Sequence, residues 1–476
     1  MRSRLRRVSR QRTPEARAYA HLASEMFGRG IAHHSGIVDY GYADDAAEHG
    51  AVGRWLHKVI PVKRSEAATV ALLATNVFIL LTCYYVLKVA REPLILLGGG
   101  AELKAYASAG QTILLLGVVP AFSWLSNRVS RIRLMTTMQV IFIGCLVAFY
   151  ALAQAKAPIG LAFYLWLGIF NALVISNFWS FANDLFTEEA GKRVFGIIGF
   201  GASIGAIVGA FVPHVLHKYL GIHGLMLFAV IGLGISIVLY QIIDKRVTTR
   251  REKKAAPVAQ DKKGGFSLVI HDRYLRLLAV MLLVATIINT TGEYVIGKVA
   301  TDHAAHMAKA AQDAYVSNFY SDYYGLVNII SAVLQGLVVA RVLTVLGLRR
   351  ALFIMPVIVL FGWVGVFTFV NLAMIRVEKT TENSLDYSLH NTVRQALFLP
   401  TSPSAKYKAK AAIDTFFFRM GDVIAGIGIV FLFVEVLGVG VKAFAALNIA
   451  LAALWIFLAY RTGKIHDQLV KSQQEA

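Results

Sequence analysis

Six polar or charged side chains recur at helical spacing within one stretch of the chain. Each lies three or four residues from the next, so on a helix they would form one stripe: Arg376, Lys379, Asn383, Tyr387, His390 and Arg394. Cations and hydrogen-bond donors on one face are suited to binding an anion. The alternative is a structural ion-pair network or a gate, because Lys379 and Glu382 are spaced for a pair. Asp386 belongs to the same candidate gate.

Catalytic chemistry is not predicted. No nucleophile, base and orienting group can be assembled from the sequence, so we expect no enzyme activity. The segment at 292–299, GEYVIGKV, lacks the hydroxyl that a phosphate loop needs after its lysine. His303 and His306 are interpreted as loop residues, so we expect neither a cofactor nor a metal site.

The rest of the chain is strongly apolar. Of its 476 residues 57% are hydrophobic and 16% charged, and the mean hydropathy is +0.59, which exceeds what a soluble core of this size buries. Eleven apolar segments of about 20 residues are long enough to cross a bilayer. They lie near 67–89, 105–125, 134–155, 159–182, 194–216, 223–243, 275–297, 319–342, 350–374, 412–436 and 441–460. The sequence therefore predicts an integral, multi-pass membrane protein.

The placement of basic residues predicts that the polar stretch crosses the membrane too. The formal net charge is +20, with twelve Lys or Arg residues up to Arg64 and eight between 244 and 265. Basic residues near span ends mark the cytoplasmic side. The later cluster formed by Arg394, Lys406, Lys408 and Lys410 returns to that side only if 376–393 is a crossing, and a helix of that length covers about 27 Å. We therefore predict twelve crossings with both termini in the cytoplasm.

Six spans, a basic linker and six more spans indicate two similar halves, the arrangement of major-facilitator transporters. The predicted fold class is an all-α polytopic membrane protein. Its predicted parts are a basic N-terminal arm (1–65), an N-terminal half (66–243), a basic linker (244–270), a C-terminal half (271–462) and a tail (463–476). Gly201, Gly205 and Gly209, four residues apart, predict close packing of the fifth span against a neighbour.

Charges inside or beside the other spans leave alternatives open. Arg419 and Asp422 are interpreted as an ion pair, with a ligand site as the alternative. Glu293 inside the seventh span is a candidate for substrate contact or proton coupling, or for pairing with a cation of another helix. Lys88 and Arg91 are candidates for phosphate binding, or side chains that reach the surface from a span end.

Three segments resemble the ATP/ADP translocase family of plastids and intracellular bacteria, together with its bacterial relatives. They are YYVLKVAREPLILLGGGAE (84–102), FWSFAND (178–184), and YSLHNTVRQALFLP (387–400) followed by KAKAAIDTFFFRMGD (408–422). The resemblance extends from residue 67 to about 460 and implies a nucleotide transporter with the major-facilitator fold.

The resemblance also implies roles for single residues. The family's cations in the first helix fall on Lys88 and Arg91, with the following acid at Glu92. Its acid in the seventh helix falls on Glu293, and its cation in the tenth on Arg394. The family's acid in the fourth helix has no counterpart, since Leu167 and Gly168 occupy that region.

We therefore predict a secondary transporter that moves a nucleotide or related phosphorylated anion by alternating access and by exchange. The alternatives are a proton-coupled permease for another organic anion, and a non-transporting scaffold or assembly protein of the same fold. The expected partners are a small anionic solute and the lipid bilayer, with anionic lipid near the arm and linker and no nucleic acid. We expect a monomer in a bacterial inner membrane.

Overall fold

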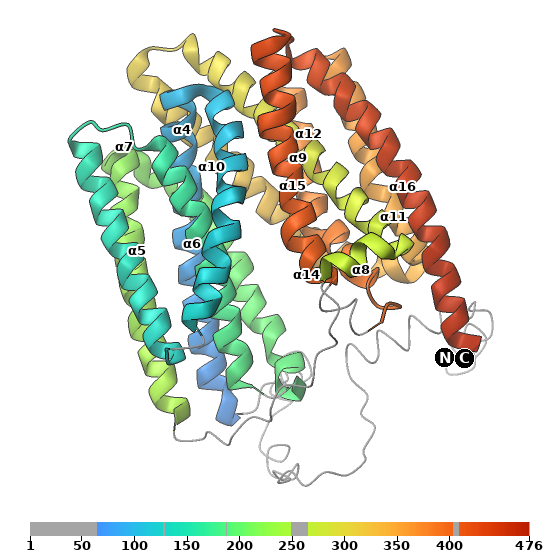
Figure 1. The fold of residues 1–476 in the computed structure, drawn as a ribbon. Helices are drawn as coiled ribbons and strands as arrows, with labels where there is room; N and C mark the ends of the chain where they lie inside the picture. The colour runs from blue at the N-terminus through green and yellow to red at the C-terminus, as the bar shows by residue number, and fades with distance from the viewer. Residues whose placement is uncertain (1–63, 127–128, 187, 249–264, 403–408, 476) are drawn as a thin grey trace, which may run out of the picture.

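The computed structural model describes residues 64–126, 129–186, 188–248, 265–402 and 409–475 (Figure 1). These residues are almost entirely helical. The predicted basic arm and most of the basic linker lie outside them, and with them the predicted contacts with anionic lipid.

Within the described residues, eight helices are long and apolar enough to span a membrane, and three of these are broken at a glycine. The breaks are at Gly100 in α4 (Arg64–Ser126), Gly221 in α7 (Glu188–Thr248) and Gly347 in α11 (Val339–Thr368), where φ is 77°, 62° and 75°. Glycine adopts positive φ without steric cost, so the chain turns at these points. The three breaks divide the eight helices into the eleven predicted apolar segments.

The remaining long helices follow in chain order. They are α5 (Arg131–Gln154), α6 (Gly160–Leu185), α9 (Arg273–Ala305), α10 (Lys309–Val333) with the π-helical turn η1 (Leu334–Val338), and α16 (Val441–Glu475). A short helix, α8 (Gly265–His271), occupies the end of the predicted linker. The predicted tail at 463–476 is for the most part a continuation of α16.

The polar stretch is a helix, as its spacing predicts. It consists of α12 (Leu372–Leu385), the π-helical turn η2 (Asp386–His390) and α13 (Asn391–Ala396). The side chain of Asn371 caps its first turn by accepting a hydrogen bond of 2.8 Å from the amide nitrogen of Met374. Most polar side chains of α12 are buried, because neighbouring helices and not lipid surround them.

The following crossing alternates between α- and π-helical turns. Its parts are α14 (Lys410–Ala412), η4 (Ile413–Phe417), α15 (Phe418–Val423), η5 (Ile424–Val430) and η6 (Leu432–Val436). The π-helical turns of the described residues all belong to the C-terminal half.

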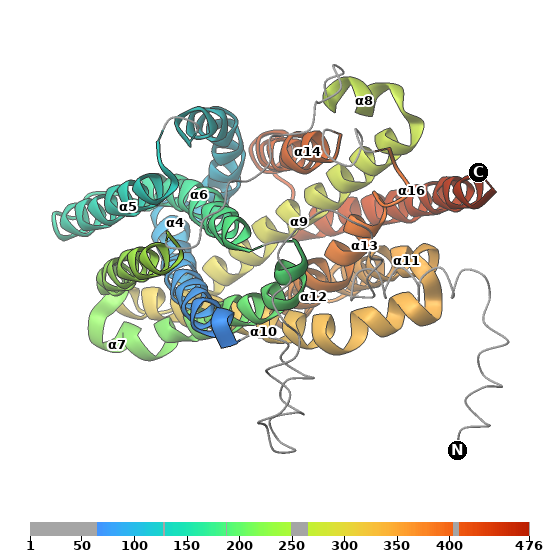
Figure 2. The same ribbon diagram turned by 90° about the horizontal axis from the view of Figure 1, so that it is seen from below.

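The two halves stand side by side (Figures 1 and 2). α4 to α7 form one half and α8 to α16 the other, and separate clusters of buried apolar side chains account for most of each core. We call the two ends of the bundle by their place in Figure 1. The upper end holds the turn within α4 and the connection of α9 to α10, and the lower end holds the start of α4, α8 and the end of α16.

Glycines in α7 let two helices touch, as the sequence predicts. A Cβ atom at Gly201, Gly205 or Gly209 would lie 2.4 to 2.6 Å from carbonyl oxygens of α4, closer than atoms approach. α10 of the other half packs on the same helix, where Ser321 Oγ donates a hydrogen bond of 2.5 Å to the carbonyl oxygen of Ala210. α4, α7 and α10 thus pack tightly against one another.

Candidate functional site: a cavity between the halves

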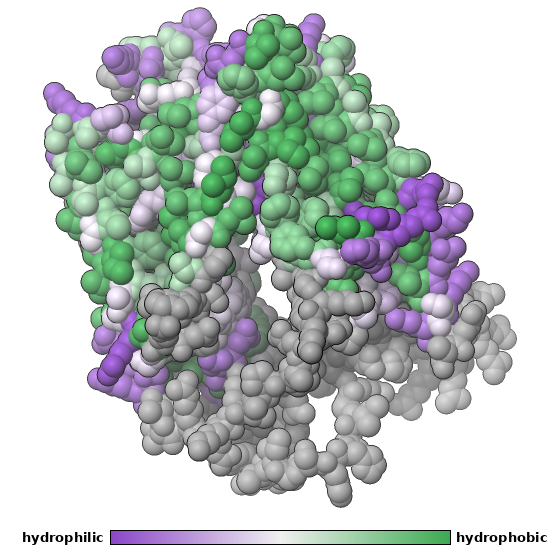
Figure 3. Space-filling view, in the orientation of Figure 1, coloured by the Kyte–Doolittle hydropathy of each residue, from purple (hydrophilic) through white to green (hydrophobic). Residues whose placement is uncertain are grey.

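A cavity of about 260 Å³ lies between the halves. Three residues at helical spacing reach it from each of the first two crossings: Tyr84, Lys88 and Arg91 before the break in α4, and Lys104, Ser108 and Gln111 after it. Tyr164 and Asn171 of α6 complete the wall of the N-terminal half. Figure 3 shows the surface hollowed between the two halves toward the lower end.

The C-terminal half lines the cavity with stripes of the same kind. They include Asn289, Thr290 and Glu293 of α9, Tyr324 of α10, Asn383, Asp386, Tyr387 and His390 of α12 and η2, and Phe418, Arg419 and Asp422 of α15. Four cations and three acids therefore face the space: Lys88, Arg91, Lys104 and Arg419 against Glu293, Asp386 and Asp422. The lining is polar on both sides and slightly cationic.

Lys88 is a buried cation without an acidic partner. Its residue is 9% exposed, and among the described residues no carboxylate lies within 4 Å of its ammonium group. The ammonium nitrogen lies 4.0 Å from the ring centre of Tyr324 and 5.2 Å from that of Tyr85. The side chain does not reach the outer surface, because it is buried and lines the cavity. A buried ammonium that faces a cavity is suited to an anionic ligand.

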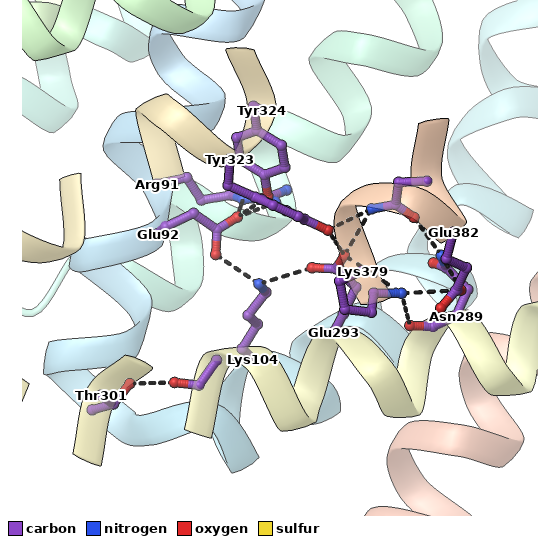
Figure 4. A network of polar contacts seen from close by, with 12 residues as sticks. Arg91, Glu92, Lys104, Asn289, Glu293, Thr301, Tyr323, Tyr324, Lys379 and Glu382 are labelled. Atoms are coloured by element: carbon purple, nitrogen blue, oxygen red, sulfur yellow. Dashed lines mark hydrogen bonds and ion pairs between the residues drawn. The ribbon is translucent and has the colours of Figure 1, made fainter. Parts of the chain in front are cut away.

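Six charged side chains form an ion-pair ladder beside the cavity (Figure 4). In order they are Arg91, Glu92, Lys104, Glu293, Lys379 and Glu382, with cations and acids alternating. The nitrogen–oxygen distances between successive members are 2.6, 2.7, 3.5, 3.9 and 3.0 Å. The contact of Lys104 with Glu293 joins α4 of one half to α9 of the other.

Uncharged side chains support the acids of the ladder. Hydroxyl groups of α10 donate to two of them, Tyr324 to Glu92 at 2.9 Å and Tyr323 to Glu293 at 3.0 Å. Amide groups donate to Glu293 as well, from Asn383 at 3.1 Å, and to the third acid, Glu382, from Asn289 at 2.9 Å. Buried ion pairs are tolerated when further hydrogen bonds reach their oxygens, and these donors reach one oxygen of each acid.

The ladder closes the upper end of the cavity. Its three cations balance its three acids, and Glu92, Lys379 and Glu382 are at most 1% exposed. Glu293 pairs with Lys104 and Lys379 and, like Arg91 and Lys104, also lines the cavity, so its predicted roles in substrate contact and proton coupling stay predictions.

The Arg419–Asp422 pair is present, with nitrogen and oxygen 3.6 Å apart. Thr290 Oγ1 donates a hydrogen bond of 2.6 Å to Asp422 and so connects α15 to α9. Both charged side chains also line the cavity. The sequence left an ion pair and a ligand site open as alternatives, and the position of these two residues is compatible with both.

Three members of the predicted stripe lie outside the cavity lining, and one of them, Lys379, belongs to the ladder. Arg376 approaches Asp322 of α10, with nitrogen and oxygen 3.8 Å apart, and its guanidinium lies 5.3 Å from the Phe319 ring. Arg394 donates a hydrogen bond of 3.1 Å to Asn391, one turn away on its own helix. The turn η2 adds a residue to the helical repeat, which rotates the residues after it relative to those before it. The six-residue stripe therefore does not stay on one face.

Sequence reasoning missed Lys104, Gln111 and Tyr324. It interpreted the segment around Gly100 as a loop, whereas α4 is helical on both sides of that residue, so Lys104 lies within a crossing. An ionisable residue close to a span was the available signal. Gly168 has a related role, since a Cβ atom there would meet the side-chain amide of Gln111 at 2.0 Å. The lack of an acid in this region leaves room for that amide.

Comparison with known proteins gives one relative of carrier type. ADP,ATP carrier protein 4 of Rickettsia felis (strain ATCC VR-1525 / URRWXCal2) is 24% identical over 299 residues. The match covers 54% of this chain and 57% of that protein, which is little more than half of either.

Solved structures are similar in fold. One is a POT family transporter in complex with 5-aminolevulinic acid, with a TM-score of 0.60 and 11% identity over 84% of this chain and 96% of that one. Another is the nucleoside transporter NupG, with a TM-score of 0.58 and 12% identity over 83% of this chain and 98% of that one.

The family itself follows from a match to a sequence profile. Residues 67–377 match the profile of the Major Facilitator Superfamily, which is more than half of the chain. Twelve helical crossings in two halves around a central cavity agree with that match. The chain therefore belongs to the Major Facilitator Superfamily.

Proposed function

We propose that this transporter moves a nucleotide of the ATP/ADP type, or a related phosphorylated anion, through the central cavity by alternating access and by exchange. The observation that carries the proposal is Lys88, a buried ammonium at the cavity wall whose charge no carboxylate within 4 Å neutralises among the described residues. Phosphate groups are bound by such desolvated cations.

The surroundings of Lys88 fit a solute with an aromatic base as well as an anionic group. Tyr84, Tyr164, Tyr294, Tyr324 and Tyr387 line the same cavity, and rings of this kind stack on nucleobases. The similarity to a protein named as an ADP,ATP carrier supports the same class of solute. Arg419 lies on the opposite wall and offers a second cation to a solute with more than one charge.

Uptake of labelled nucleotides into proteoliposomes tests the proposal. We expect the purified protein to exchange internal ATP or ADP for external labelled nucleotide. Lys88→Gln removes one charge-assisted hydrogen bond, worth about 1.5–3 kcal/mol, so the concentration for half-maximal uptake should rise about 10- to 100-fold. Lys298→Gln is the matched control, because Lys298 is 40% exposed and both of its acidic partners, Asp302 and Glu102, lie outside the cavity lining.

Several results would contradict the proposal. One is uptake that Lys88→Gln leaves unchanged, and another is uptake of other anions but of no nucleotide. If a broad panel of anions produced no uptake, and charge removal at Lys88, Arg91, Glu293 and Arg394 left the wild-type phenotype, the scaffold alternative would be favoured.

A second candidate is a permease for an organic anion of lower charge. It is favoured by the three acids of the lining, since Glu293, Asp386 and Asp422 offset all but one of its four cations. A carboxylate or monophosphate would then be preferred over a triphosphate. Competition of unlabelled monocarboxylates, monophosphates and nucleoside triphosphates for the same uptake distinguishes the two candidates.

A further inference from the structure

Glu378 is a buried carboxyl group that the ladder does not use. It lies on α12, is 3% exposed, and forms no ion pair within 4 Å among the described residues. Its Oε1 atom is buried without a hydrogen-bond partner. A Cβ atom at Gly362 of α11 would lie 1.5 Å from its Oε2 atom, so the carboxyl group occupies the space that this glycine leaves.

The helices around Glu378 supply no cation that is free to pair with it. On α12, Lys379 is held by Glu382 at 3.0 Å and approaches Glu293 of α9 at 3.9 Å, while Arg376 turns to Asp322 of α10. Asn289 of α9 and Tyr323 of α10 bond to α12 at Glu382 and Asn383, and not at Glu378. On α11 the residue that lies against the carboxyl group is Gly362, which carries no charge.

Electrostatic balance therefore requires Glu378 to be neutral in this conformation. The three cations of the ladder already match its three acids. Glu382 is one helical turn from Glu378 on the same face, and two ionised carboxylates so placed repel each other. Because an unpaired carboxylate out of water is strongly disfavoured, the group takes up a proton instead.

We propose that Glu378 is a proton-binding site, and that Glu382 and Lys379 couple its protonation to the ladder that closes the upper end of the cavity. The bound proton lies on the Glu378 carboxyl group and leaves to water when the surroundings of α12 change. The ionised group then adds a third negative charge beside Lys379, after those of Glu382 and Glu293, and draws its ammonium from Glu293. The contact between Glu293 and Lys104, which joins the halves, is thereby altered.

The consequence is that the transporter carries a proton together with its solute. This rests on the proposed function only in that the chain transports a solute, whatever its identity. An anion that enters with a proton brings less net negative charge across the membrane.

The first test does not depend on the solute. Infrared spectra of the protein in lipid vesicles at neutral pH should contain the carbonyl band of a protonated carboxylic acid, and Glu378→Gln should remove part of it. Glu378→Asp keeps the carboxyl group and should shift that part of the band. Glu435→Gln is the matched control, because Glu435 is exposed and its contact is a hydrogen bond of 3.3 Å from Tyr106. A carboxylic acid band that is identical in wild type, Glu378→Gln and Glu378→Asp would overturn the proposal.

The second test uses transport. An inward proton gradient should increase accumulation of the transported anion by about tenfold in wild type and not in Glu378→Gln, while exchange of internal for external solute continues in both. Equal stimulation of the two proteins would refute the coupling. If no solute is transported at all, the proposed function fails, and the infrared measurement still decides whether Glu378 holds a proton. If Glu378→Gln does not fold, Glu378→Asp takes its place in this test, because it retains a proton-binding group.

Discussion

The two ends of the bundle differ in how their charges are paired. At the upper end charges pair across the halves, where Lys104 of α4 contacts Glu293 of α9 at 3.5 Å. At the lower end arginines pair within their own half, Arg193 with Glu66 at 3.4 Å and Arg349 with Asp467 at 3.0 Å. Contacts across the halves hold one end shut, whereas contacts within a half leave the halves free to separate. The structure therefore represents a state whose cavity is closed at the upper end.

The comparison also separates buried from exposed charge. The upper-end ladder is buried and supported by tyrosine and asparagine donors, whereas the lower-end arginines have side chains 31% and 47% exposed. Removing one partner of a buried pair leaves the other charge without compensation, but an exposed group is solvated by water. The two ends should respond very differently to the same kind of substitution.

The largest effect is expected at Lys104. Lys104→Met keeps the length of the side chain and removes the charge between Glu92 and Glu293, so it should lower the free energy of unfolding by about 3–5 kcal/mol. Thermal unfolding in detergent measures the loss. Combined with Glu293→Gln, it should cost less than the sum of the single changes, because both act on the same contact. Strict additivity would show that the ladder does not join the halves energetically.

An intermediate effect is expected where helices touch without charge. Gly205→Val places a Cβ atom 2.4 Å from the carbonyl oxygen of Phe78, so α7 and α4 must move apart at a cost of about 1–3 kcal/mol. Gly199→Ala is the control on the same helix, since nothing lies within 4 Å of its added atom. Thermal unfolding of both variants is the measurement, and similar losses in the two would contradict the close-packing argument.

The smallest effect is expected at the lower end. Arg349→Ala removes a half-exposed ion pair with Asp467 and should change the free energy of unfolding by less than about 1 kcal/mol. Unfolding at low and high salt compares this variant with wild type. A loss as large as that of Lys104→Met would remove the distinction between the two ends.

Much of the fold follows from patterns in the sequence. Hydropathy placed the eleven apolar segments, and the periodic polar residues of 376–394 predicted a helix that the structure confirms. Helical periodicity assumes a constant turn, however, and the π-helical turn η2 breaks that assumption. Arg394 follows that turn and does not line the cavity, whereas Asn383, Tyr387 and His390 do. Arg376 and Lys379 precede the turn and pair with Asp322 and Glu382 instead. The roles of these residues in binding remain predictions.

Candidate site residues were predictable where an ionisable group lies in an apolar segment. Glu293 stood out for that reason, because a charge within a span requires partners. Lys104 did not, since Gly100 made its surroundings resemble a loop. Spacing within one segment also could not show that Lys379 lies between Glu293 and Glu382, because Glu293 belongs to α9 and Glu382 to α12.

The sequence by itself determined that this chain crosses a membrane many times, that its polar stretch is a helix, and which helix faces carry polar groups. These are properties of local composition and period, which neighbouring residues decide. The tertiary structure alone decided which charges pair and which remain unpaired, because pairing depends on distances between helices far apart in the chain. Lys88 facing the cavity and Glu378 enclosed by α11 are the two results of that arrangement, one suited to an anion and the other to a proton.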